Sequence, residues 1–336
     1  TSTNSSIGLI YALKKIFMTK KRKKNILIIG CLGHIGYSLS VYLSQKYNIV
    51  ATYNNTSNKN LLKNLKSKNI KLFKVDVSNK KLFKKILGKF NFDTCVYAAA
   101  VAHDSIAKHN TEKTIKANCQ GVINFLNFNK KNCKLIYIST GSVFQNIKSS
   151  KDRISENVKP SPASLYSVSK RFGELLIEND YPKKKMCTVL RVSWVYGPPI
   201  INKKIDVQRG PIPFILTHLF NLDKEKLIFK SGKDFEASFT YIKDVCYALE
   251  KLINYKKFPH PVFHLGSGKN YKLSEVCKII NKNFKKKLLT MGKGFLPWTS
   301  DSIIRGPLIS NLNNKFKIKY SLEDGLKEYI KFFTDK

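Results

Sequence analysis

Short apolar runs alternate with helix-length stretches from residue 25 to about residue 196, and this alternation constrains the fold more than any other feature. Strands that alternate with helices pair in parallel and are covered by helices on both faces. We therefore predict an α/β fold built on a doubly wound parallel sheet. The predicted strands are Ile26–Ile29, Ile49–Tyr53, Lys71–Val77, Thr94–Ala98, Lys134–Ser139 and Thr188–Val192.

The alternation ends near Gly197, where several prolines interrupt the chain. We predict a main domain of residues 25–196 and a smaller C-terminal α/β lobe of residues 197–336 that binds the substrate. Segments within residues 239–265 are expected to return to the main domain. Further predicted elements are the strands Ile228–Phe239 and Val262–Gly266 and the helix Leu273–Phe284.

Residues 1–24 form a basic N-terminal extension that ends in the run Lys20–Lys24. Its apolar part, Ile7–Phe17, contains lysines and is not followed by a small-residue cleavage site, so it is a poor signal peptide. This apolar part is equally compatible with an amphipathic surface helix and with a stretch upstream of a start at Met18.

The formal net charge of +39 raises the question of a nucleic-acid partner, because Lys and Arg neutralise phosphates. Only six of the 61 basic residues are Arg, however, and the lysines are spread over the whole chain. Nucleic-acid readers favour Arg for its planar, bidentate geometry. We therefore expect no nucleic-acid partner. Because Arg is rare in this chain, we expect Arg191 and Arg305 to occupy sites where Lys could not replace them.

The seven cysteines form no Cys-x-x-Cys pair, are odd in number and lie partly within apolar runs. This pattern indicates a reducing compartment rather than a disulfide framework, and it predicts no metal site. No apolar stretch approaches the roughly 20 residues that a membrane span needs. We predict a cytoplasmic protein without a membrane span.

A glycine-rich string, Gly-Cys-Leu-Gly-His-Ile-Gly, lies directly after the first predicted strand and opens the first helix. Glycines there permit a tight turn and close approach of a pyrophosphate, and the helix N-terminus offers amide donors to it. We therefore predict a Rossmann-type dinucleotide site. Its predicted contacts are Gly30, Gly33, His34, Ile35 and Gly36.

The end of the second predicted strand bears on which dinucleotide binds. An acidic residue there would accept hydrogen bonds from the adenosine ribose and select NAD. Here Tyr53 is followed by Asn54 and Asn55, with Lys59 nearby and no carboxylate. This composition favours NADP, with NAD as the alternative.

Tyr166 and Lys170 are four residues apart, so on a helix they share one face. An unperturbed phenol has a pKa of about 10, and a neighbouring cation is expected to lower this pKa toward the working range. The pair alone is weak evidence in a chain rich in both residue types. Together with the glycine loop it predicts a proton relay beside a dinucleotide.

With these two motifs on one chain, the sequence resembles the extended short-chain dehydrogenase/reductase superfamily, specifically the NAD(P)-dependent epimerase/dehydratase family of nucleotide-sugar enzymes. The resemblance runs from Asn25 to about Glu328. It implies a catalytic set of Tyr166, Lys170 and Thr140, of which Lys170 also anchors the nicotinamide ribose. The further cofactor contacts that it implies are Asp76, Val77, Ala98, Ala99, Ala100, Asn118, Tyr166 and Lys170.

The chain departs from the family pattern in informative places. Sugar 4,6-dehydratases carry an acidic pair after the active-site Thr, but Gly141 and Ser142 stand here, which argues against dehydration. Gln145 stands where Gly is usual. The segment 190–197 and the segment that begins at Arg305 are similar to those of dTDP-4-dehydrorhamnose reductases. The implied substrate contacts are His103, Thr140, Ser142, Trp194 and Arg305, with Asp104 beside them.

The resemblance favours a reductase that acts on the 4-keto group of a nucleotide-activated sugar for surface polysaccharide, with Tyr166 as the proton donor. A nucleotide-sugar 4-epimerase with retained NAD is the alternative within the family. A non-catalytic NADP-binding regulatory subunit is the alternative from another class, and the presence of both Tyr166 and Lys170 argues against it. The family commonly forms homodimers through two helices, so a homodimer is a further expectation.

Overall fold

The computed structural model describes residues 22–55, 59–129, 133–147, 152–199, 210–221, 226–284, 288–295, 306–310 and 317–335. Most of the predicted N-terminal extension and Arg305, a predicted substrate contact, lie outside these residues. Within the described part of the chain, no helix is long and apolar enough to cross a membrane.

A parallel sheet of seven strands forms the centre of the molecule, in the order β11-β6-β5-β4-β1-β2-β3. The predicted α/β fold with a doubly wound parallel sheet is therefore confirmed. The chain order reverses between β1 and β4, and ligands bind at such switch points, beyond the carboxyl ends of the strands. The strands are β1 Asn25–Ile29, β2 Asn48–Tyr53, β3 Lys71–Lys74, β4 Thr94–Tyr97, β5 Lys134–Thr140, β6 Cys187–Val192 and β11 Val262–Leu265.

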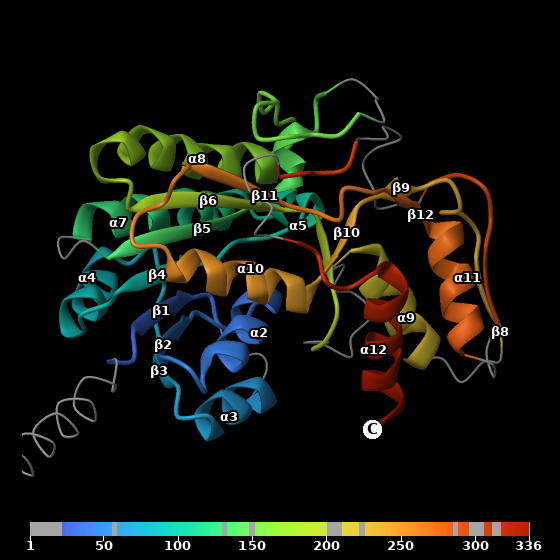
Figure 1. Ribbon diagram of the computed structural model, residues 1–336, viewed down its shortest axis with the longest axis horizontal. Coiled ribbons are helices and arrows are strands. Elements are labelled where there is room, and N and C mark those ends of the chain that lie inside the picture. Colours follow the sequence, from blue (N-terminus) through green and yellow to red (C-terminus); the bar gives the residue numbers. More distant parts are fainter. Residues whose placement is uncertain are drawn as a thin grey trace, which may run out of the picture.

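Helices cover both faces of this sheet (Figure 1). Alternate residues of β1 explain this, since Ile26 and Ile28 enter one apolar core and Leu27 and Ile29 enter the other. The first core includes α2 and α10, and the second includes α4, α7 and α8. The helices are α2 His34–Leu43, α3 Lys59–Ser67, α4 Lys80–Lys89, α5 Asp104–Lys108, α6 Thr111–Ile115, α7 Gly121–Phe128, α8 Leu165–Lys184 and α10 Ile242–Asn254.

The remaining elements gather beside one end of the sheet, where Figure 1 shows α9, α11 and α12 side by side. Three two-stranded sheets accompany them, pairing β10 with β7, β12 with β9 and β13 with β8. The helices are α9 Pro211–Asn221, α11 Leu273–Asn283 and α12 Leu322–Thr334. The strands are β7 Trp194–Tyr196, β8 Lys226–Phe229, β9 Glu236–Ala237, β10 Phe239–Tyr241, β12 Tyr271–Lys272 and β13 Leu288–Met291.

Element boundaries differ from the prediction in two instructive places. The single strand predicted at Ile228–Phe239 is wrong, because the chain turns at Gly232, whose φ is +123°, and forms three short strands instead. The third strand ends at Lys74 rather than Val77. Beyond it, the Asp76 side chain accepts hydrogen bonds from the backbone and hydroxyl of Ser78, which closes a local turn instead of extending the strand.

Candidate active site

The glycine loop connects β1 to α2 as a tight turn. Gly30 has a φ of +89°, and a Cβ there would lie 2.6 Å from the backbone nitrogen of Ala99. A Cβ on Gly36 would lie 2.2 Å from the Gly30 carbonyl oxygen. Gly33 caps the N-terminus of α2 without a side-chain bond, so the first amides of this helix face outward. The loop therefore fits a pyrophosphate that approaches the backbone closely.

The strand ends beside the glycine loop supply the next predicted contacts. Ala98 and Ala100 follow β4 and line a cavity of about 450 Å³, while the Ala99 backbone supports Gly30. Asp76 accepts a hydrogen bond from Asn54 at 3.3 Å, which joins the ends of β2 and β3. Burial opposes ionisation of Asp76, but hydrogen bonds from Ser78 and Asn54 outweigh it and lower its pKa.

Helix α8 presents the Tyr166–Lys170 pair on its first two turns. Ser164 and Ser167 form a capping box at its N-terminus, which fixes where the helix begins. Tyr166 forms a side-chain hydrogen bond with Thr140 at the end of β5, so the predicted catalytic residues Tyr166, Lys170 and Thr140 all line the same cavity. The Thr140 hydroxyl also accepts a hydrogen bond from the Ser142 backbone at 3.1 Å.

The electrostatics of the pair differ from the sequence expectation. Burial raises the pKa of Tyr166 to about 12; the Thr140 hydrogen bond opposes this and the Asp104 charge adds to it. Burial also lowers the pKa of Lys170 to about 7, against the charges of Glu174 and Cys119. Desolvation of both groups therefore dominates, and the lowering of the phenol pKa that we expected from Lys170 does not occur.

Lys170 is held in an aromatic and polar environment. It is 3% exposed, and its Nζ lies 3.9 Å from the centre of the Tyr137 ring. An ammonium over an aromatic face is attracted to the ring's negative quadrupole. This contact fixes the lysine side chain between α8 and β5.

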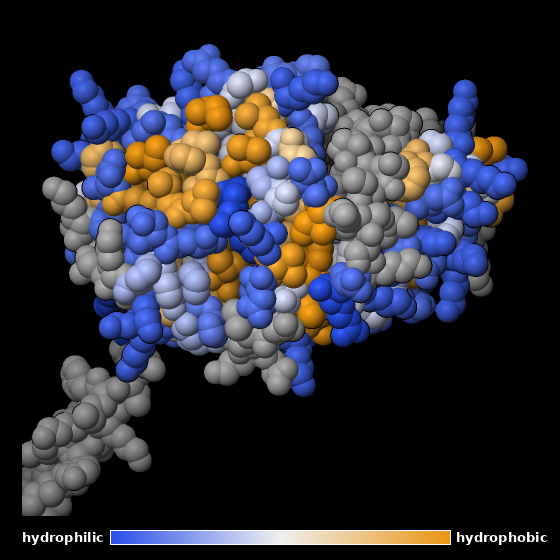
Figure 2. Space-filling model, turned by 90° about the horizontal axis from the view of Figure 1, so that it is seen from above, coloured by the Kyte–Doolittle hydropathy of each residue, from blue (hydrophilic) through white to orange (hydrophobic). Residues whose placement is uncertain are grey.

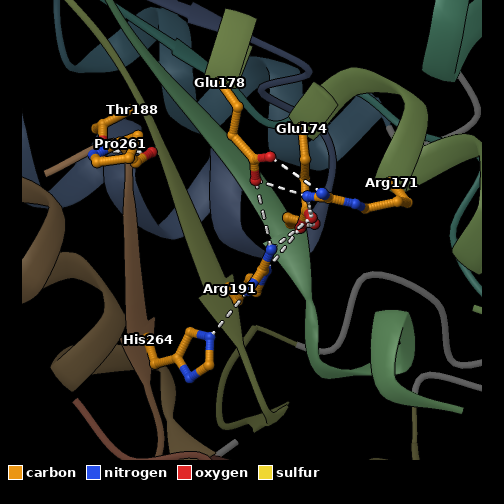
Figure 3. Close-up of polar contacts among 8 residues, drawn as sticks. Arg171, Glu174, Glu178, Thr188, Arg191, Pro261 and His264 are labelled. Carbon is orange, nitrogen blue, oxygen red and sulfur yellow. Dashed lines mark hydrogen bonds and ion pairs between the residues drawn. The ribbon is translucent and has the colours of Figure 1, made fainter. Parts of the chain in front are cut away.

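A buried ion-pair network lies one helical turn further along α8 (Figure 3). Arg191 Nε and Nη2 donate to the two carboxylate oxygens of Glu174 at 2.9 and 2.8 Å, in a bidentate geometry that Lys cannot adopt. Ser139 donates to the same carboxylate at 2.5 Å. Because Ser139 directly precedes Thr140, the network ties α8 to the strand that carries the Thr140 hydroxyl.

The network continues to β11 and to α8 itself. Arg191 Nη1 lies 3.2 Å from His264 Nε2, and burial lowers the pKa of His264 to about 4. On the other side, Arg171 donates to Glu174 and to Glu178. Burial opposes ionisation of Glu174, but its hydrogen bonds from Arg191 and Ser139 hold its pKa below the ordinary value.

The predicted substrate residues His103 and Trp194 lie together. Their rings stack at 6.2 Å with an interplanar angle of 22°, and Trp194 also meets Phe235 edge-on. His103 has a φ of +74°, a strained conformation for a residue other than glycine. Both residues and Ser142 line the cavity together with Thr140, Tyr166 and Lys170.

The cavity brings together most of the predicted contacts but not all. His34 lines it, yet its Nε2 also pairs with the Gly197 carbonyl oxygen at 2.8 Å. Asn118 is fully buried behind the cavity, where its side chain binds the Val101 backbone and the Ser169 hydroxyl. The predicted residues that line the cavity are Gly33, His34, Ile35, Ala98, Ala100, His103, Thr140, Ser142, Tyr166, Lys170 and Trp194. Those outside its lining are Gly30, Gly36, Asp76, Val77, Ala99 and Asn118.

The side chains that lie behind the cavity and hold its lining in place were not predicted from the sequence. The sequence spacing could have indicated Glu174, since it lies four residues after Lys170 and so shares its helix face. Gln145 Nε2 donates to Asp104 Oδ2 at 2.6 Å. The only sequence feature that pointed to this contact was the unusual residue type at position 145. Contacts between distant segments depend on the tertiary fold, which local patterns do not specify.

A parallel sheet with a glycine loop at its switch point, facing a Tyr-Lys pair and a Thr, defines a dinucleotide-binding α/β enzyme. The family model described as GDP-mannose 4,6 dehydratase matches residues 27–301, and the chain belongs to this family. The predicted membership of the extended short-chain dehydrogenase/reductase superfamily is thereby confirmed.

Three known proteins illustrate the similarity. An uncharacterized protein of Methanocaldococcus jannaschii is 28% identical over 93% of this chain and 97% of its own length. A UDP-glucuronate 4-epimerase of Thermodesulfobacterium geofontis is 25% identical over 90% of this chain and 94% of its own. The crystal structure of dTDP-glucose 4,6-dehydratase from Bacillus anthracis in complex with NAD superposes with a TM-score of 0.74, at 22% identity, over 93% of this chain and 97% of that one.

Proposed function

We propose that this protein reduces the 4-keto group of a nucleotide-activated sugar, in a pathway that makes surface polysaccharide. The observation that carries this proposal is the hydrogen-bonded pair of Tyr166 and Thr140, which line one cavity with Lys170, and the phenol is protonated at neutral pH because its pKa is about 12. A protonated phenol donates, as reduction of a ketone to an alcohol requires. A bound nicotinamide would supply the hydride at this place.

The chain's own residues each have a defined task in this proposal. Tyr166 gives its proton to the oxygen of the keto group, and Thr140 holds that oxygen in place. Lys170, fixed over the Tyr137 ring, binds the nicotinamide ribose and supplies positive charge beside the phenol. The stacked rings of His103 and Trp194 form a wall for the sugar ring, while Ser142 and Arg305 complete the predicted substrate contacts.

We propose NADP as the cofactor and retain NAD as the alternative. The absence of a carboxylate in the segment after β2, together with Lys59 at the start of α3, supports NADP. The carboxylate of Asp76, which lies beside Asn54 at the end of β2, is engaged by Ser78. NAD is favoured by the Bacillus anthracis enzyme structure, which contains it.

A nucleotide-sugar 4-epimerase is the second candidate, and the similarity to a UDP-glucuronate 4-epimerase over nearly the whole chain favours it. An epimerase would oxidise and then reduce the same carbon, so it would need Tyr166 to accept a proton first. A non-catalytic regulatory subunit is not supported, since Tyr166, Lys170 and Thr140 share one cavity. Dehydration is disfavoured by Gly141 and Ser142 after Thr140.

The test is to incubate the protein with NADPH or NADH and a panel of nucleotide 4-ketosugars and to follow the loss of reduced nicotinamide by absorbance. Steady loss with one sugar supports the reductase. Interconversion of UDP-hexoses without net consumption of added cofactor would instead establish the epimerase. Tight cofactor binding without turnover of any sugar would contradict both.

We also propose that the molecule functions in the cytoplasm as a homodimer, with a main domain of residues 25–196 and a substrate lobe of residues 197–336. A row of exposed apolar side chains on α8 supports the dimer: Val168 is 48%, Phe172 39% and Leu175 51% exposed. Figure 2 shows apolar side chains gathered on the face on which α8 lies in Figure 1. Such a patch on an enzyme surface is typical of a protein interface.

A further inference from the structure

Asp104 lies at the catalytic end of the cavity and is held there from two sides. It begins α5, and its Oδ2 accepts a hydrogen bond from Gln145 Nε2 at 2.6 Å. Its Oδ1 accepts from the Ser164 hydroxyl at 2.5 Å. The carboxylate thus joins the start of α5, the turn after β5 and the start of α8. Both partners are neutral side chains.

We call Asp104 with its hydrogen-bond partners Gln145 and Ser164 the clamp. Ser164 connects this clamp to the proposed chemistry. It is the N-cap of α8, accepts the Ser167 amide at 3.2 Å, and lies two residues before Tyr166. The Ser164 amide also donates to Gln145 Oε1 at 3.1 Å. Gln145 therefore binds Asp104 with one end of its side-chain amide and the first turn of α8 with the other. A residue without a side-chain amide or hydroxyl at this position would make neither bond.

We propose that Asp104 is a positioning residue for Tyr166. Clamped by Gln145 and Ser164, it fixes the first turn of α8 against Thr140, and its carboxylate disfavours the phenolate form of Tyr166. This inference rests on the proposed role of Tyr166 as the proton donor.

The charges around the phenol agree with this role. After burial, which is the main cause, the Asp104 charge contributes to the raised pKa of Tyr166. The described titratable groups that line the cavity are His34, His103, Asp104, Tyr166, Lys170 and Glu236. Behind the cavity lie Tyr137 on β5, Cys119 on the helical turn Lys116–Gln120, and Glu174 on α8. Among these, Asp104 is the carboxylate that acts on Tyr166.

The test is a titration of Tyr166 that needs neither cofactor nor substrate. Tyrosine labelled with ¹³C at Cζ is followed by NMR, and the Tyr166 signal is assigned by its loss in Tyr166→Phe. In Asp104→Asn we expect the phenol pKa to fall by about 1 unit, that is, about tenfold more phenolate at a fixed alkaline pH. Circular dichroism at the same pH establishes that each variant is folded.

Two matched variants separate the charge from the clamp. Glu236→Gln removes the other carboxylate of the described cavity lining, and we expect it to leave the Tyr166 titration unchanged. Gln145→Ala keeps the Asp104 charge but removes the clamp, so amide hydrogen exchange at Ser167 should become faster than in the unmodified protein.

Equal Tyr166 titrations in Asp104→Asn and the unmodified protein would overturn the electrostatic part of the proposal. Equal exchange at Ser167 in Gln145→Ala would overturn the positioning part. Because neither readout involves turnover, the inference can fail while the reductase proposal stands. Conversely, the Tyr166 titration can shift as expected in a protein that reduces no sugar.

Discussion

At the scale of single residues, Tyr166 is the group on which the proposed chemistry depends. Replacing Tyr166 with Phe removes one hydroxyl and keeps the ring, so the fold of α8 should be unchanged. We expect the turnover rate to fall by about 10²–10⁴-fold, because proton donation in the transition state is lost. Steady-state kinetics measure this, with cofactor affinity as the control. A loss below tenfold would contradict the assigned role.

Lys170 gives the site a pH dependence of its own. Its pKa of about 7 means that it loses its proton, and with it the positive charge beside the phenol, as the pH rises through neutrality. Turnover should therefore decline with rising pH around this value. The residual activity of Lys170→Met should lack the decline. A decline of the same shape in that variant would assign it to another group.

His264 provides a test of stability at the residue scale. Burial lowers its pKa from 6.5 to about 4, so the unfolded chain binds a proton that the folded protein does not bind between these values. The stabilising contribution is thus complete above pH 6.5 and is lost as the pH falls toward 4, a difference of about 3 kcal/mol. Denaturant unfolding across this range should show a shallower pH dependence for His264→Gln. An unchanged dependence would contradict the assignment.

At the scale of secondary-structure elements, the Glu174–Arg191 pair joins α8 to β6. Glu174→Gln would leave the buried Arg191 charge without its bidentate partner, and we expect a loss of about 3–5 kcal/mol in the free energy of unfolding. Glu112→Gln is the matched control, because Glu112 pairs with Lys116 on the surface, where solvent screens the pair and its loss should leave the free energy of unfolding nearly unchanged. Similar losses in the two variants would show that burial of the pair is not decisive.

The elements also show what local sequence can and cannot specify. The strand-glycine-helix unit at β1 and α2 was predictable, because backbone geometry demands glycine at Gly30 and apolar residues in a buried strand. The stretch from Ile228 to Phe239 was not, because its turn at Gly232 depends on a backbone bond from Lys233 to Gly292, far along the chain. For the same reason the pairing of Glu174 with Arg191 emerged only from the fold.

At the scale of the whole molecule, the apolar row on α8 predicts a dimer. Phe172→Asp places a charge in the middle of this row and should convert the protein to monomers in analytical ultracentrifugation. Ile228→Asp is the matched control, since Ile228 is 61% exposed on β8, away from α8. A monomeric unmodified protein, or dissociation in both variants, would contradict an interface on α8.

We propose that this molecule transfers hydride from a nicotinamide cofactor to the keto carbon of a nucleotide sugar. The most direct measurement uses reduced cofactor that carries deuterium at the transferable position of the nicotinamide, together with the 4-ketosugar that is consumed. We predict stoichiometric deuterium at C4 of the product sugar by NMR. A converted sugar without deuterium from the added cofactor would contradict the account and would identify an epimerase that recycles its own bound cofactor.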